Sequence, residues 1–261
     1  MLCVLLLVGR NRIVFPIRGG VSGDPRRYGI PDGEHVQIPS ADGERLTAWF
    51  LPPRGEAGTA GAVIWFHGNG ETVAGLAPVI RELRPEHAAL LAVEYRGYGE
   101  SSGTPTVANV ARDAEAAWEW LATRPEIDSS RIVVYGRSLG TGPALQLGAT
   151  RPVAGLVLES AFTSLRALAR AHYPIFPAAL AGSGFDNLAA IARVRMPVLF
   201  IHGDADRIIP IAMGRELAAR VTASEFWVIR GADHNDTYDL GAHEYARRFK
   251  EFVARFAESG K

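Results

Sequence analysis

The stretch Arg131-Ile-Val-Val-Tyr-Gly-Arg-Ser-Leu-Gly-Thr-Gly-Pro-Ala144 decides how the rest of the sequence is interpreted. It begins with an apolar, β-branched run that is typical of a buried strand, and it ends in an Ala- and Leu-rich run that is typical of a helix. Between the two runs lies the pattern G-x-S-x-G, from Gly136 to Gly140. Because the chain holds 28 glycines in 261 residues, the pattern alone arises easily by chance. Its weight comes from the strand and the helix on either side.

This context predicts that Ser138 is a nucleophile. A tight turn from strand to helix would hold the serine at the edge of the sheet in a strained backbone conformation and expose its hydroxyl group. Gly136 and Gly140 keep side chains out of the turn, and the backbone N–H of Leu139, which begins the next helix, can stabilise an oxyanion. The alternative is that Ser138 only begins a helix, a position that serine favours.

The composition excludes several classes of protein. Lys plus Arg and Asp plus Glu both number 28, so the net charge is zero and no nucleic-acid partner is expected. The single cysteine, Cys3, excludes an internal disulfide and favours the inside of a cell. A chain of this length, 48% of it hydrophobic, can form one α/β domain with a full core.

The N-terminal segment 1–8 is apolar, but it is shorter than the roughly 20 residues that a membrane-spanning helix needs. It lacks the basic residues and the cleavage site of a secretory signal. Residues 9–33 are rich in Gly, Arg and Pro and complete an irregular arm, so that residues 1–33 precede a domain at 34–261. We expect a cytoplasmic protein whose first residues pack on the domain. A peripheral membrane contact through residues 1–8, or a truncated anchor, is the alternative.

From residue 62 onward, short apolar runs alternate with helical patterns, which is typical of a parallel sheet covered on both faces. Two hairpin strands and six buried strands are expected at 35–39, 44–51, 62–66, 88–93, 131–135, 155–158, 197–201 and 225–229. Helices are expected at 73–83, 107–121, 139–149, 211–221 and 242–256. The sequence therefore predicts one α/β domain with an eight-stranded, mostly parallel sheet flanked by helices.

Polar side chains follow each buried strand, at the edge of the sheet where open α/β folds bind their ligands. These side chains lie in the segments 67–70, 94–99, 138, 159–160, 202–206 and 231–236. The sequence thus brings a serine, several carboxylates and several histidines to one edge of the sheet.

These segments resemble the α/β-hydrolase superfamily, and within it the branch of Bem46 and the alpha/beta-hydrolase domain-containing proteins of types 12, 13 and 17. The resemblance covers residues 35–256. It rests on the strings Phe66-His-Gly-Asn-Gly, Tyr95-Arg-Gly-Tyr-Gly-Glu-Ser-Ser-Gly103, Gly136-Arg-Ser-Leu-Gly-Thr-Gly, Glu159-Ser-Ala-Phe-Thr-Ser164, Ile201-His-Gly-Asp-Ala-Asp206 and Gly231-Ala-Asp-His-Asn235. It implies the α/β-hydrolase fold, with a short cap at 161–194 between strands six and seven.

The resemblance also implies a catalytic triad, with Ser138 as the nucleophile, Asp206 as the acid and His234 as the general base. It implies further that the backbone N–H of Asn69 joins that of Leu139 in an oxyanion hole.

Other residues compete for these roles. Asp204 and Glu159 are rival acids, whereas His67 and His202 are rival bases, although a histidine before glycine at a strand end more often organises a loop. The glycine-rich segment 97–103 lacks the spacing of a dinucleotide-binding loop. The histidines and carboxylates lack a metal-ligand spacing, so neither a metal nor another cofactor is expected.

In the cap, Phe162, Tyr173 and Phe176 are expected to line an acyl pocket that is partly open to solvent. The alternative is that these rings only pack the cap onto the sheet. The balanced charge and the apolar cap favour a small neutral ester or a lipid-like substrate. We therefore expect a serine hydrolase that cleaves carboxylic esters of short-to-medium acyl chains through an acyl-enzyme. An acyl-protein thioesterase or lipid deacylase, and a non-catalytic membrane-associated scaffold, are the alternatives.

Overall fold

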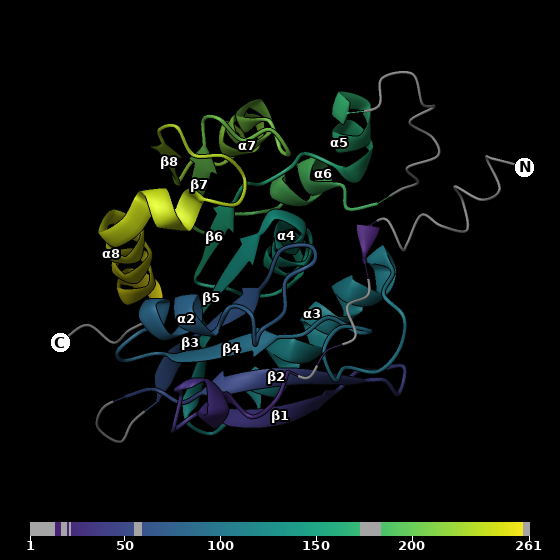
Figure 1. The fold of residues 1–261 in the computed structure, drawn as a ribbon, viewed down its shortest axis with the longest axis vertical. Coiled ribbons are helices and arrows are strands. Elements are labelled where there is room, and N and C mark those ends of the chain that lie inside the picture. Colours follow the sequence, from purple (N-terminus) through teal and green to yellow (C-terminus); the bar gives the residue numbers. More distant parts are fainter. Residues whose placement is uncertain (1–13, 17–19, 21, 55–58, 173–183, 258–261) are drawn as a thin grey trace, which may run out of the picture.

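The computed structural model describes residues 14–16, 20, 22–54, 59–172 and 184–257. Its eight strands form one sheet in the order β1-β2-β4-β3-β5-β6-β7-β8 (Figure 1). β1 pairs with β2 and β2 with β4 in antiparallel fashion, and every other neighbouring pair is parallel. The strands are β1 (Glu34–Pro39), β2 (Arg45–Leu51), β3 (Ala60–Phe66), β4 (Ala89–Val93), β5 (Ile127–Arg137), β6 (Gly155–Glu159), β7 (Val198–Gly203) and β8 (Ser224–Ile229). This sheet confirms the predicted fold class.

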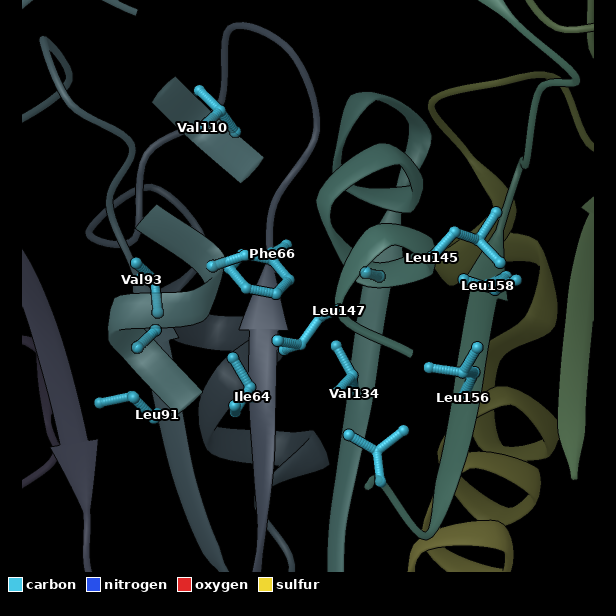
Figure 2. Close-up of a cluster of buried hydrophobic side chains, with 14 of the residues drawn as sticks. Ile64, Phe66, Leu91, Val93, Val110, Val134, Leu145, Leu147, Leu156 and Leu158 are labelled. Carbon is cyan, nitrogen blue, oxygen red and sulfur yellow. The ribbon is translucent and has the colours of Figure 1, made fainter. Parts of the chain in front are cut away.

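Helices cover both faces of the sheet, and each face has its own apolar cluster. One face carries α3 (Val107–Ala122), α4 (Thr141–Thr150), α6 (Asn187–Ile191) and α7 (Ile211–Ala218). The other carries α2 (Ala77–Leu83) and α8 (Thr237–Ala257). In β3, Ile64 and Phe66 point to the first cluster, which Figure 2 shows, whereas Val63 and Trp65 point to the second. Burial on both faces explains why the central strands β3 to β7 contain continuous apolar runs in the sequence.

The last helix, α8, packs against the beginning of the central strand β3. A Cβ atom on Gly61 would lie 2.1 Å from the carbonyl oxygen of Ala257 and 2.4 Å from that of Arg131, so only glycine fits between them. Ala242 interrupts α8 with non-helical backbone angles (φ 45°, ψ −131°). The predicted helix 242–256 begins at this kink, and the structure adds a further helical segment, from Thr237, on its other side.

Two predicted helices begin later than expected. For the helix predicted at 73–83, α2 begins at Ala77, and residues 73–76 form turns, in which the N–H of Leu76 donates to the carbonyls of Thr72 (3.1 Å) and Val73 (3.2 Å). For the helix predicted at 139–149, residues 138–140 form the short 3-10 turn η2, and α4 begins at Thr141. The Thr141 hydroxyl donates to the carbonyl of Ser138 (2.7 Å).

The described part of the N-terminal arm packs on the sheet. Phe15 is fully buried, the Trp49 indole N–H donates to the carbonyl of Gly23 (2.9 Å), and the turn η1 (Pro25–Tyr28) follows. Residues 1–8, for which membrane contact is the alternative, lie outside the described residues. Within the described ranges, no helix is both long enough and apolar enough to span a membrane.

A short cap lies between β6 and β7, as expected. It contains α5 (Leu165–His172) and α6, while residues 173–183 lie outside the described residues. The Asn187 side chain donates to the carbonyl of Phe162 (2.9 Å), and His172 Nε2 lies 2.6 Å from the carbonyl oxygen of Ile208. The first contact joins the two described ends of the cap to each other, and the second joins α5 to the loop between β7 and α7.

Candidate active site

The turn from β5 into α4 holds Ser138 in a left-handed backbone conformation, with φ of 52°. Both glycines of the motif are required by the space around them. A Cβ atom on Gly136 would lie 2.3 Å from the carbonyl oxygen of Gly140, and one on Gly140 would lie 2.2 Å from that of Phe66. The strained elbow is therefore as predicted. Ser138 is only 7% exposed, less than expected, because the imidazole of His234 lies over its hydroxyl group.

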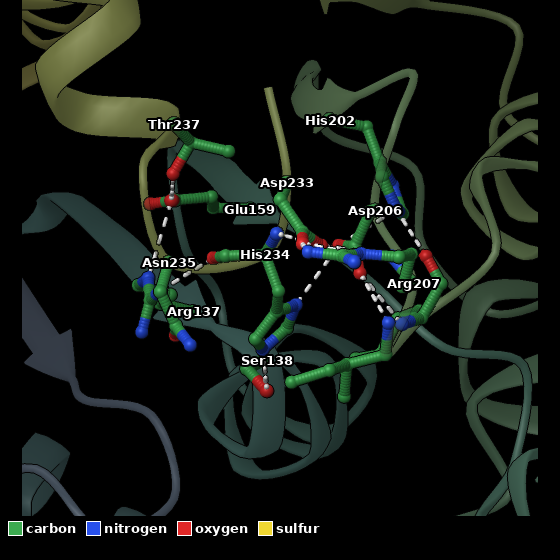
Figure 3. A network of polar contacts seen from close by, with 12 residues as sticks. Arg137, Ser138, Glu159, His202, Asp206, Arg207, Asp233, His234, Asn235 and Thr237 are labelled. Carbon is green, nitrogen blue, oxygen red and sulfur yellow. Dashed lines mark hydrogen bonds and ion pairs between the residues drawn. The ribbon is translucent and has the colours of Figure 1, made fainter. Parts of the chain in front are cut away.

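At the carboxyl edge of the sheet, the His234 ring lies between Ser138 and Asp206 and contacts both of them (Figure 3). His234 Nε2 is 2.9 Å from Ser138 Oγ, and His234 Nδ1 is 2.8 Å from Asp206 Oδ2. Ser138 follows β5, Asp206 follows β7, and His234 follows β8. The three side chains that the sequence selects from distant segments are thus in direct contact.

The carboxylate of Asp206 is held in its ionised form. Its burial alone would raise the pKa, but contacts from His202 and His234 and the backbone N–H of Ile209 lower the pKa of Asp206 well below its usual range. Oδ1 accepts from the N–H groups of Ile208 (2.9 Å) and Ile209 (2.7 Å), which leaves Oδ2 to face the histidine ring. An ionised carboxylate at Nδ1 keeps the proton on that nitrogen, so that Nε2 is free to accept from Ser138.

The rival residues have other partners. Asp204 accepts from the N–H of Gly231 (2.6 Å), and Glu159 lies in a buried network on the far side of His234. His202 Nε2 is 2.8 Å from the carbonyl oxygen of Ile209, so this histidine organises a loop, as expected. The same nitrogen also lies 3.5 Å from Asp206 Oδ2, a contact that sequence reasoning missed.

His67, the other rival base, is fully buried beneath the loop that follows β3. Its Nε2 is 3.3 Å from Glu94 Oε2, and its Nδ1 is 2.9 Å from the carbonyl oxygen of Gly68. Burial would lower the pKa of His67, but the Glu94 carboxylate outweighs this effect and raises it. An imidazolium that forms an ion pair with Glu94 and donates from Nδ1 to the carbonyl of Gly68 fits these contacts and holds the loop in place.

The loop 67–70 begins beside the elbow, because Phe66 of β3 is paired with Gly136 of β5. The hydroxyl group of Tyr95 donates to the carbonyl of His67 (2.7 Å), and that of Tyr98 donates to the Asn69 side chain (3.3 Å). These bonds fix the loop next to Ser138 without using the backbone N–H of Asn69. The predicted roles of the Asn69 and Leu139 N–H groups in an oxyanion hole stay predictions.

Arg137, the residue before the nucleophile, is a functional candidate that sequence reasoning missed. Its Nη2 donates to the carbonyl of His234 (2.7 Å), its Nε to Glu159 (3.2 Å), and its Nη1 pairs with Glu71. Only 13% of its side chain is exposed. The signal in the sequence was a charged residue shortly after the apolar run 132–135 and directly before the candidate nucleophile.

A pocket of about 160 Å³ adjoins Arg137, between α2 and α8, on the face of the sheet opposite to α4. Its walls include Trp65, Glu71, Asn235 and Tyr238. The pocket is therefore bordered by the loop that follows His234 and by the guanidinium group of Arg137.

The predicted acyl-pocket residues fall into two groups. Phe162 is 1% exposed and belongs to the apolar cluster beneath the cap, which fits the alternative in which this ring packs the cap onto the sheet. Tyr173 and Phe176 lie outside the described residues. A pocket role for the three rings stays a prediction. Among the described residues, no group of His, Cys, Asp and Glu side chains is arranged to hold a metal ion.

The chain belongs to the α/β-hydrolase family, the class that this sheet and elbow define, and it is a hydrolase of the α/β fold. It is 31% identical to the alpha/beta hydrolase domain-containing protein WAV2 of Arabidopsis thaliana, over 97% of this chain and 90% of that protein. The human alpha/beta hydrolase domain-containing protein 17B is 36% identical over 64% of this chain and 56% of that protein, which confirms the predicted resemblance to the type 17 branch.

Two further comparisons agree with this family. Residues 57–183 match the sequence family described as Serine aminopeptidase, S33. The fold is similar to that of an esterase from Pyrococcus furiosus, with a TM-score of 0.78 and 24% sequence identity, over 94% of this chain and 98% of that one.

Proposed function

We propose that the protein is a serine hydrolase that cleaves carboxylic esters of neutral, short-to-medium acyl chains through an acyl-enzyme. The observation that carries the proposal is the pair of contacts on His234, 2.9 Å to Ser138 Oγ and 2.8 Å to Asp206 Oδ2. A serine hydroxyl becomes a nucleophile when a neutral imidazole nitrogen accepts its proton, and the ionised Asp206 supplies the required tautomer.

In the proposed reaction, Ser138 Oγ attacks the carbonyl carbon of the ester while His234 Nε2 takes the serine proton. The backbone N–H groups of Leu139 and Asn69 stabilise the oxyanion of the tetrahedral intermediate. The intermediate collapses, the alcohol leaves with the proton from His234, and the acyl group stays on Ser138. A water molecule then attacks the acyl-enzyme with His234 as the base, which releases the acid and restores the serine.

Three carboxylates near the triad already pair with arginines, which favours an ester over an aminopeptidase substrate, whose ammonium group needs a carboxylate partner. Glu71 and Glu159 both pair with Arg137, and Asp233 pairs with Arg207. Each of these acidic groups next to the triad therefore already binds a cation. The structural likeness to the Pyrococcus furiosus esterase is consistent with this preference.

Turnover of p-nitrophenyl esters from acetate to palmitate, by the wild type and by Ser138→Ala, tests the proposal. We expect kcat to fall by at least about 10,000-fold in Ser138→Ala, because the triad acts as a unit. A fluorophosphonate probe should label the wild type and leave Ser138→Ala unlabelled. Aminoacyl p-nitroanilides and acyl thioesters in the same assay separate the amide and thioester alternatives.

Equal turnover by the wild type and by Ser138→Ala would refute the serine mechanism. A wild type that is folded, reacts with none of these substrates and takes up no probe would point to the scaffold instead. Preference for palmitate over acetate would replace the short-to-medium acyl assignment with that of a lipid deacylase.

A further inference from the structure

We infer that Arg137 is a positioning residue that joins the general-base loop to the oxyanion loop, so that both keep one geometry around Ser138. The inference rests on the proposed function and deepens it, because it assigns a role to the variable residue of the G-x-S-x-G motif. Three different segments of the chain meet at its guanidinium group: the loop before α2, the end of β6 and the loop after β8.

The contact with the general-base loop is made to the main chain. Arg137 Nη2 donates to the carbonyl oxygen of His234 itself (2.7 Å) and lies 3.3 Å from Oδ1 of Asn235 (Figure 3). Because Arg137 directly precedes Ser138 in the chain, this bond ties the backbone of the base to the backbone of the nucleophile. It therefore restrains the distance between Ser138 Oγ and His234 Nε2 independently of Asp206.

The contact with the oxyanion loop runs through Glu71. Arg137 Nη1 pairs with one oxygen of the Glu71 carboxylate, and the other oxygen accepts from the backbone N–H of Gly68 (2.5 Å). Gly68 precedes Asn69, whose N–H is the proposed second oxyanion donor. A Cβ atom on Gly68 would lie 2.9 Å from Arg137 Nη1, so loop and guanidinium group are in close contact. Through Glu71, Arg137 thus holds the loop whose Asn69 N–H is proposed to face the oxyanion.

The third contact fixes the guanidinium group itself. Its Nε donates to Glu159, which is almost fully buried, and Thr237 donates to the same carboxylate oxygen (2.5 Å). Tyr135 and Tyr245 donate to the other oxygen. Burial alone would raise the pKa of Glu159, but the positive charge of Arg137 and these donors lower it, so the carboxylate stays ionised.

The shape of the side chain matters as much as its charge. A guanidinium group presents its N–H donors in a planar fork, whereas a lysine ammonium is a single point charge. One arginine can therefore contact Glu159, Glu71 and the carbonyl of His234 in three directions at once. A lysine in its place can keep an ion pair but cannot keep all three bonds.

The test measures kcat and KM of Arg137→Ala and Arg137→Lys on the best p-nitrophenyl ester. We expect kcat of Arg137→Ala to fall on the order of 100-fold with KM within about threefold, because misplacing catalytic groups by about 1 Å has an effect of this size. Arg137→Lys should lose about tenfold in kcat, with a melting temperature near that of the wild type. The Arg137→Lys variant still tests the inference if Arg137→Ala does not fold.

Arg84 offers a matched control. Its side chain is 2% exposed, forms two bonds to Asp32 (2.7 Å each) and donates to one backbone carbonyl, that of Pro52 (2.6 Å). Like Arg137, it is a buried arginine that binds a carboxylate and a backbone carbonyl, but Asp32 is 42% exposed and Arg84 lies at the end of α2, away from the triad. We expect Arg84→Ala to lower the melting temperature, and Arg84→Lys to keep it near that of the wild type. Both variants should leave kcat within about twofold of the wild type.

Removal of the side chain in Arg137→Ala also extends the adjoining pocket of about 160 Å³ into the space of the guanidinium group. Free guanidinium at millimolar concentration should then raise kcat of Arg137→Ala several-fold above a matched concentration of sodium chloride. It should have no such effect on Arg84→Ala or on Ser138→Ala. Rescue of this kind reports the missing contacts and not the overall fold.

Hydrogen exchange of the peptides covering 67–72 and 231–237 gives a readout that does not need turnover. We expect both to exchange at least about tenfold faster in Arg137→Lys, and neither to change in Arg84→Lys. A folded Arg137→Ala or Arg137→Lys with kcat within threefold of the wild type and unchanged exchange in both loops would overturn the inference. If wild type and Ser138→Ala turn over esters equally, the proposed function fails, and the exchange of the two loops still decides whether Arg137 joins them.

Discussion

Two arginines hold the loop of His234 from opposite sides, and they differ most in how far water reaches them (Figure 3). Arg207 is 85% exposed and pairs with Asp233, whereas Arg137 is 13% exposed and pairs with the buried Glu159. An exposed ion pair is screened by water and contributes about 0–1 kcal/mol, but loss of one partner from a buried pair costs about 3–5 kcal/mol. The two sides of the same loop should therefore respond very differently to the same substitution.

Backbone N–H groups that bind Asp233 explain part of the difference between the two sides of the loop. The pKa of Asp233 is lowered to about 2, chiefly by the backbone N–H of Arg207 and only then by its guanidinium group. The same carboxylate oxygen accepts from the N–H groups of Arg207 (2.9 Å) and His234 (2.8 Å). On the outer side the loop is thus held largely by peptide groups, which any residue provides. On the inner side it is held by a side chain that only arginine provides.

Within this comparison, the largest loss of kcat is expected for Asp206→Asn. This loss is the upper limit for any residue that acts on catalysis by positioning the loops around Ser138. An amide at this position cannot stabilise the imidazolium and favours the wrong tautomer of His234, so kcat should fall by about 10,000-fold. Ester hydrolysis at pH 7 measures it, with the melting temperature as the control for folding. A loss below tenfold would show that another carboxylate, such as Asp204, supports His234.

Glu159→Gln tests whether the inner side depends on a buried charge. The pKa of Glu159 is lowered in the folded protein, so its ionised form contributes stability above the unfolded pKa of about 4.3, and this contribution is lost as the pH falls below that value. We expect the variant to be less stable than the wild type by about 3 kcal/mol at pH 7. Urea unfolding at pH 7 and at about pH 3.5 should show this difference shrinking in acid. A difference that is the same at both pH values would contradict the charge-based account.

The smallest effect is expected for Arg207→Ala. The variant keeps the backbone N–H that binds Asp233, and it loses only an exposed ion pair. The free energy of unfolding should change by less than about 1 kcal/mol and kcat by less than about threefold. Added salt at about 0.5 M should remove most of the remaining difference from the wild type. A loss comparable with that of Arg137→Ala would mean that burial does not distinguish the two sides.

The central strands were predictable because they are buried on both faces and each contains a short continuous apolar run. The elbow was predictable for a local reason, since Gly136 and Gly140 are required by atoms of the turn and of the neighbouring strand. The beginning of α2 was not, because residues 73–76 have the apolar pattern of a helix but form turns in the folded protein. The helix boundary at Ala242, next to Gly241, was predicted, whereas the helical segment that begins at Thr237 was not.

In the candidate site too, features set by the local sequence were predictable, whereas features set by distant contacts were not. Ser138 followed from its own surroundings, but the choice of Asp206 over Asp204 and Glu159 came from the family resemblance. Nothing in the spacing of these residues distinguishes them, because each follows a strand of the same sheet. The contacts of Arg137 join three segments that are far apart in the sequence, and the register that brings them together exists only in the folded sheet.

The close approach of Gly61 to the end of α8 has a consequence for the synthesis of the protein. Residues near position 61 leave the ribosome long before Ala257, yet the two pack against each other in the finished molecule. Until α8 is made, Trp65 and Tyr135 lack Phe249, whose ring packs against both of them in the folded protein. Translation therefore passes through a stage in which a growing chain exposes a large apolar surface. We expect chaperones that recognise such surfaces to bind at this stage.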